Sequence, residues 1–117
     1  MPVPRNQSVI RRLEELLAAN PGRPFFLSEI HAAIDVGERT FRALCAQHFG
    51  MSPHRYLWLR RMRLARCALA RADPDRTTVT RVASHYGFGE LGRFAVAYKG
   101  LFGESPSVTL QRCATGG

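Results

Sequence analysis

The sequence predicts an all-α fold in which two helix-turn-helix subdomains are joined by a long linker helix, with about seven helices in total. Three observations lead to this prediction. Apolar residues recur with helical spacing through most of the chain, a glycine-marked pattern occurs twice, and a helical stretch without glycine or internal proline separates the two copies. We therefore expect an N-terminal helix and first helix-turn-helix over residues 1–52, a linker helix over 53–73, and a second helix-turn-helix with a C-terminal helix over 74–117.

The repeat is clearest near the end of each copy. Residues of the first copy recur 53 positions later: Phe41, Cys45, Phe49, Gly50, Ser52 and Pro53 match Phe94, Tyr98, Phe102, Gly103, Ser105 and Pro106. Upstream the offset is 52, which pairs Ile30, Asp35 and Val36 with Val82, Gly87 and Phe88. The second copy therefore has one additional residue in or just after its turn. Internal repetition of this kind predicts two units of similar structure.

The second copy shows the helix-turn-helix pattern most directly. A short helical pattern stops at Gly87, as helices often do at a glycine. A second pattern then places four apolar residues on one side of a helix: Phe94, Tyr98, Leu101 and Phe102. The opposite side carries Gly92, Arg93, Val96 and Lys99. Such a helix suits a DNA groove, and an ordinary helical hairpin with a solvated face is the alternative.

The first copy follows an amphipathic helix expected over residues 6–19, which Asn20-Pro21-Gly22 ends. Ser28 is the expected N-cap of a short helix that continues to about residue 34. Asp35-Val36-Gly37 forms the first turn, where aspartate tolerates the left-handed conformation, although less well than glycine. A helix over residues 38–49 then exposes Arg39, Arg42, Ala43 and Ala46 and buries Phe41, Leu44, Cys45 and either His48 or Phe49.

The linker helix starts with a capping serine and a first-turn proline, Ser52-Pro53. It runs to about residue 72, a length of roughly 30 Å. Six arginines make it strongly basic, and we expect most of them on a solvated face: Arg55, Arg60, Arg61, Arg63, Arg66 and Arg71. Ser105-Pro106 starts a last helix in the same way, and residues 113–117 are expected to form a frayed tail.

The charge of the chain favours a polyanionic partner. Among 117 residues, 17 are Lys or Arg and 9 are Asp or Glu, which gives a net charge of +8 and an isoelectric point near 10.7. An anionic membrane surface is the competing partner, but no segment approaches about 20 unbroken apolar residues. The hydrophobic content of 45% is enough for a packed core.

The cysteines and histidines do not predict a metal or cofactor site. Cys45, Cys67 and Cys113 are odd in number and widely spaced, and no Cys/His pair has the spacing of a zinc site. Cys45 and Cys67 are expected to be buried or half-buried on helices. We expect no cofactor, no metal, and a reduced, cytoplasmic location.

These residues resemble the DNA-binding domain of the AraC/XylS transcription regulators. The matching motifs are Gly87-Phe88, Arg93-Phe94, Tyr98-Lys99, Phe102-Gly103-x-Ser105-Pro106 and the run from Phe49 to Leu57. The resemblance covers about residues 6 to 111 and implies bacterial transcription control by sequence-specific binding to double-stranded promoter DNA. It implies activation through contacts with RNA polymerase, and no enzymatic activity.

Carried over by position, the family's base-reading residues fall on Arg39, Arg42 and Ala43 in the first unit. In the second unit they fall on Leu91, Gly92, Arg93 and Val96, and Lys99 shares their helix face. Two departures concern the first turn: Asp35 replaces the usual glycine, and Gly37 replaces the usual capping serine, at a cost of up to about 1 kcal/mol. Because Leu91, Gly92 and Val96 are apolar or small, the second unit is expected to read thymine methyl groups or DNA shape.

Most members of that family carry a separate domain that senses a ligand and dimerises. We therefore expect a DNA-binding fragment, itself monomeric, of a chain that dimerises through such a domain, and a stand-alone regulator is the alternative. Two other classes remain open at this point. A DNA-repair methyltransferase-type regulator would need an acceptor cysteine, and a helical protein-interaction module would not bind DNA.

Overall fold

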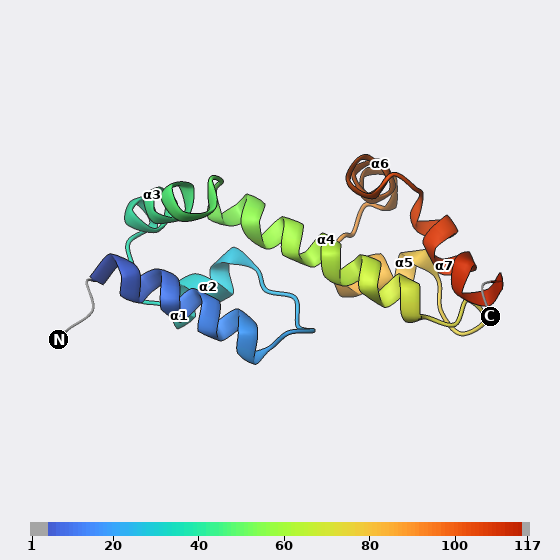
Figure 1. The fold of residues 1–117 in the computed structure, drawn as a ribbon, viewed down its shortest axis with the longest axis horizontal. Helices are drawn as coiled ribbons and strands as arrows, with labels where there is room; N and C mark the ends of the chain where they lie inside the picture. The colour runs from blue at the N-terminus through green and yellow to red at the C-terminus, as the bar shows by residue number, and fades with distance from the viewer. Residues whose placement is uncertain (1–4, 116–117) are drawn as a thin grey trace. The chain divides into compact units, whose positions relative to one another are not determined.

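The computed structural model describes the backbone of residues 5–115 and the side chains of residues 8–112. The fold is all-α, as predicted. Its helices are α1 (Arg5–Ala19), α2 (Leu27–Ala33), α3 (Glu38–Phe49), α4 (Pro53–Arg71), α5 (Val79–His85), α6 (Leu91–Phe102) and α7 (Pro106–Thr115) (Figure 1). The chain divides into two compact units, Met1–Leu59 and Arg60–Gly117, so the division falls within α4.

The duplication predicted from the sequence is present in the structure. Both ends of α6 lie 53 positions after those of α3, and both ends of α5 lie 52 positions after those of α2. Residues 34–37 join the first pair and residues 86–90 the second, which confirms the additional residue in the second turn. Gly50 and Gly103 end α3 and α6 in the left-handed conformation, with φ of 73° and 78°. Only glycine adopts such angles without strain.

The two turns have different backbone geometries. Gly87 has a φ of 89°, and the next amide, of Phe88, donates to the carbonyl of Ala83 over 2.9 Å, as in a Schellman motif. In the first unit Ile34 leaves α2 in an extended conformation. Within residues 5–115 every residue with positive φ is a glycine, so the left-handed conformation considered for Asp35 does not occur. The shorter first turn therefore reaches α3 without a left-handed residue.

The prediction that Ser28 is the N-cap of α2 is wrong. The helix α2 begins at Leu27, so Ser28 already lies inside its first turn. Glu29 reaches back instead, and its carboxylate accepts a 3.0 Å hydrogen bond from the amide of Phe26. Glu29 also pairs with Arg23 over 2.7 Å. A carboxylate three residues into a helix satisfies a free N-terminal amide as well as a serine would.

Hydroxyl caps occur where the sequence predicts them on two other helices. Ser52 Oγ accepts from the amide of Arg55, and Ser105 Oγ accepts from the amide of Val108, both over 3.2 Å. Gly37 caps α3 without a side-chain hydrogen bond, as expected. Each cap fixes the residue at which its helix starts.

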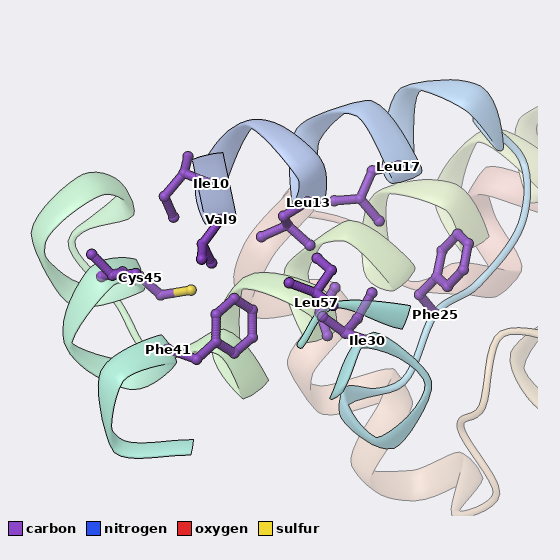
Figure 2. Packing of buried hydrophobic residues seen from close by; sticks show 11 residues of the cluster. Val9, Ile10, Leu13, Leu17, Phe25, Ile30, Phe41, Cys45 and Leu57 are labelled. Atoms are coloured by element: carbon purple, nitrogen blue, oxygen red, sulfur yellow. The ribbon is translucent and has the colours of Figure 1, made fainter. Parts of the chain in front are cut away.

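The core of the first unit lies between α1, α2, α3 and the first turns of α4 (Figure 2). The buried residues of this core are Val9, Ile10, Leu13, Leu17, Phe25, Ile30, Ile34, Phe41, Leu44, Cys45 and Leu57. They confirm the amphipathic pattern predicted for α1 and the inward side predicted for α3. Cys45 is fully buried, and burial raises the pKa of its thiol to about 11. The exposed face of α3 is thus held by a packed interior.

A row of aromatic rings along α6 forms part of the core of the second unit. The centroids of successive rings are 5.0 Å apart for Phe88 and Phe94, 5.6 Å for Phe94 and Tyr98, and 4.7 Å for Tyr98 and Phe102. Phe94 and Tyr98 are buried, as predicted. Leu101, expected on the same buried side, is 40% exposed. Periodicity identifies a side of a helix but not which of its turns are covered.

One of the six arginines of α4 is buried, and Arg60 is half-buried. Arg61 is only 7% exposed, and its guanidinium carbon lies 5.4 Å from the centroid of the Phe88 ring. Burial lowers its pKa from the usual value. Arg66 reaches Phe102 at 4.9 Å, so α4 supplies a cation near each end of the aromatic row. These contacts link α4 to the turn before α6 and to the last residue of α6.

Two further predictions, for Cys67 and for the C-terminal tail, differ from the structure. Cys67 is exposed on α4 rather than half-buried. The helix α7 continues to Thr115, beyond the point at which a frayed tail was expected, and the side chain of Cys113 lies outside the described residues. Over residues 5–115, none of the helices is both long and apolar enough to span a bilayer.

Candidate nucleic-acid interface

The outward face of α3 carries the residues expected to read bases in the first unit. Arg39, Arg42 and Ala43 are all exposed, while Phe41 and Leu44 of the same helix are buried. Arg42 Nη2 lies 3.1 Å from Glu38 Oε1, one helical turn earlier. A surface pair of this kind contributes only about 0.3–0.5 kcal/mol, so Arg42 can leave Glu38 for a stronger acceptor.

The outward face of α6 carries the corresponding residues of the second unit. All five are exposed: Leu91, Gly92, Arg93, Val96 and Lys99. Val96 is 77% exposed although it is apolar, and Leu91 is 41% exposed. The exposed cations Arg93 and Lys99 can offer hydrogen bonds, and the exposed apolar side chains Leu91 and Val96 can contact thymine methyl groups. DNA contact by these residues stays a prediction.

Glu90 also lies at the N-terminal end of α6, although the sequence pattern did not predict a role for it. It is the N-cap of α6, and its carboxylate accepts from the amide of Gly92 over 3.2 Å and from the amide of Arg93 over 2.8 Å. Its Oε2 atom also lies 3.9 Å from Nε of Arg93. An acidic residue immediately before a predicted helix is the signal that could have identified it.

Buried polar contacts fix the inner side of α6. Tyr98 Oη donates to Thr109 Oγ1 of α7 over 2.7 Å, and Thr109 in turn donates to Glu104. Arg112 forms an ion pair with the same carboxylate. The outward residues of α6 are therefore presented by a helix whose inner face is held by both rings and hydrogen bonds.

The face on α3 belongs to the first unit and the face on α6 to the second. Among the described side chains, no three His, Cys, Asp or Glu residues are grouped as a metal site would require. The chemistry available at both faces is thus that of arginine and lysine donors, a glutamate acceptor and small apolar groups.

Comparison with known proteins agrees with this architecture. The helix-turn-helix domain family matches residues 30–112, more than half of the chain. A crystal structure of a probable AraC family transcriptional regulator from Rhodopseudomonas palustris is 36% identical, with a TM-score of 0.73 over 91% of this chain and 97% of that one. The chain belongs to the AraC-type helix-turn-helix family of transcription regulators.

Other members of the family extend the comparison. The chain is 34% identical over 110 residues to a probable thc operon regulatory protein of Rhodococcus erythropolis, and 32% identical over 110 residues to a XylDLEGF operon transcriptional activator of Pseudomonas putida. Each alignment covers 94% of this chain but 33% of the relative, so the chain spans about a third of their length. An AraC-type regulator from Chromobacterium violaceum, 22% identical with a TM-score of 0.75, shares the fold.

Proposed function

We propose that this AraC-type domain binds double-stranded promoter DNA sequence-specifically, with α3 and α6 each entering the major groove, and that it activates transcription. The observation that carries the proposal is the duplicated unit, in which two helices of equal length expose arginines and small residues on the face opposite a packed core. Helix-turn-helix proteins place their second helix in the groove in this way. The net charge of +8 supplies the attraction to phosphate.

The exposed residues divide into donors and apolar contacts. Arg39, Arg42 and Arg93 are proposed to donate to guanine O6 and N7, the commonest specific arginine contact in the major groove. Ala43 and Val96 are proposed to contact thymine methyl groups. Leu91 and Gly92 lie at the start of α6, where a small residue allows the helix to approach base edges. Lys99 lies in the last turn of α6 and is proposed to contact phosphate.

The wider biological role rests on the family and on the relatives' names. One relative is named as an operon activator, and another as an operon regulatory protein. We propose that this domain likewise acts at a promoter in the cytoplasm, as a monomeric DNA-binding part, and that it contacts RNA polymerase. A longer regulator would dimerise through another domain.

We propose that the chain is not an enzyme. A methyl-accepting cysteine must reach its thiolate form, but burial raises the pKa of Cys45 to about 11 and keeps that thiol protonated at neutral pH. Cys67 is exposed on α4, away from both proposed recognition helices in the sequence. Absence of methyl transfer from alkylated DNA to any cysteine, followed by intact-protein mass spectrometry, is the expected result.

Binding as a function of salt tests the proposal. A duplex selected from a random pool by the protein is titrated at several salt concentrations, with a scrambled duplex as control. Affinity should fall by about 0.9 log units per log unit of salt for each phosphate contact, and the selected duplex should bind more tightly throughout. Affinity that is independent of salt, or equal for both duplexes, would contradict specific DNA binding.

A further inference from the structure

The two recognition helices begin differently. The N-cap of α6 is Glu90, whereas 53 positions earlier the N-cap of α3 is Gly37, which has no side chain to offer. Two of the free amides in the first turn of α6, those of Gly92 and Arg93, are already bonded to the Glu90 carboxylate. Amides at a helix start often bind DNA phosphate. In α6 a phosphate would meet a carboxylate in that place.

The Glu90 carboxylate retains capacity to accept further hydrogen bonds. An ionised carboxylate has about four lone-pair directions, and here two amides use two of them. The side chain is 64% exposed, so the remaining directions are open to a partner. In the major groove, only the amino groups of cytosine and adenine can donate to such an acceptor. Guanine O6 and N7 cannot, because they are acceptors themselves.

Arg93 provides the complementary chemistry at the same end of α6. Its side chain is 91% exposed, and its Nε lies 3.9 Å from the Glu90 carboxylate. An acceptor and a donor are therefore adjacent at the N-terminal end of the helix, the end from which helix-turn-helix proteins contact base edges. The partial pairing also weakens the attraction of Arg93 to phosphate in general.

We propose that Glu90 is a specificity-determining residue of the second unit. Its carboxylate keeps phosphate away from the start of α6 and accepts a hydrogen bond from a cytosine or adenine amino group beside the base that Arg93 contacts. This inference rests on the proposed function. It adds a polar reader to a helix face on which only Arg93 and Lys99 carry polar side chains among the residues first assigned to it.

Two neutral substitutions separate this role from simple helix capping. Glu90→Ser removes the charge but keeps a good N-cap, and Glu90→Gln removes the charge with little change in shape. The matched control is Glu15→Gln, which removes one exposed carboxylate from α1 in the first unit. Binding is measured by fluorescence anisotropy with the duplex selected by the wild type, a scrambled duplex, and a set of single base-pair changes. A thermal melt of each variant checks folding.

Both Glu90 variants should bind the scrambled duplex about threefold to tenfold more tightly, and their salt slope should steepen by up to about 0.9. Their preference for the selected duplex should fall about tenfold, with the loss concentrated at one or two adjacent base pairs. Glu15→Gln should change neither the preference nor its position. Folded Glu90→Ser and Glu90→Gln proteins that keep the wild-type preference within twofold would reduce Glu90 to a helix cap. A loss spread evenly over the site would also overturn the inference, while a wild type that prefers no duplex would overturn the proposed function itself.

Discussion

Tyr98 of α6 donates a hydrogen bond of 2.7 Å to Thr109 of α7, and both side chains are buried. Burial is the main cause that raises the pKa of Tyr98, so its hydroxyl keeps its proton and remains a donor. Thr109 passes the network on to Glu104, which also pairs with Arg112. A chain of four polar groups therefore links the inner face of a recognition helix to the surface of α7.

Glu104 makes the stability of the second unit depend on pH. The hydrogen bond from Thr109, followed by the interactions with Arg112, lowers the pKa of this carboxyl from its ordinary value of 4.5. A lowered pKa stabilises the folded state above the ordinary value, and this stabilisation disappears as the pH falls through the lowered one. Glu104→Gln should therefore have a lower melting temperature than the wild type at neutral pH. The difference in melting temperature should shrink as the pH falls below about 4.5.

Thermal melts of both proteins between about pH 7 and pH 3 measure this difference. Glu15→Gln is the control, because Glu15 is an exposed residue of α1 in the other unit. A gap between Glu104→Gln and wild type that stays constant across the whole range would show that the carboxylate charge does not stabilise the fold.

Phe94 anchors α6 in the aromatic row. Its side chain is 2% exposed and lies between the rings of Phe88 and Tyr98. Phe94→Ala should lower the free energy of unfolding by about 3–5 kcal/mol, since it removes buried apolar area and leaves a cavity. Val96→Ala, on the exposed side of the same helix, should change it by less than about 0.5 kcal/mol. Urea unfolding compares the three proteins, and equal effects of the two substitutions would contradict the helix orientation.

Arg61 stabilises the turn between α5 and α6 by packing against Phe88. Its planar guanidinium packs over Phe88, and a lysine ammonium would keep the charge but lose the flat contact. Arg61→Lys should therefore cost roughly 1–2 kcal/mol of stability. The control is Arg63→Lys at an exposed position of α4, which should be within about 0.5 kcal/mol of wild type. Urea midpoints that are the same for both variants would remove Arg61 from this role.

The sequence predicts best those elements that are determined by residues close together in the chain. The 53-residue offset and the glycines Gly50 and Gly103 predict both recognition helices, and α3 spans the range predicted for it, residues 38–49. Capping by Ser52 and Ser105 is equally local, because a hydroxyl beside a first-turn proline has a close amide to bond. The exposure of Arg39, Arg42 and Arg93 follows from the same helical periodicity.

Other features depend on contacts that no local pattern contains. A hydrophobic pattern counts arginine as polar and therefore places Arg61 on the surface. Its burial results from packing against Phe88, which lies far from it in the sequence. Glu29 rather than Ser28 caps α2 because the helix starts two residues earlier than expected, and a longer side chain then reaches the free amide. The cap made by Glu90 is local, and an acidic residue directly before α6 is the sequence signal for it.

Footprinting on base-substituted duplexes tests most directly the central claim that both recognition helices read DNA. With the wild type we predict two protected blocks centred about 10 bp apart. Arg39→Ala or Arg42→Ala should relax base preference in one block, and Arg93→Ala in the other, at a cost of roughly 1–3 kcal/mol per lost guanine contact. A single contiguous block, or the same base pairs altered by arginines of both units, would contradict the account and favour a symmetric dimer that uses one unit per chain.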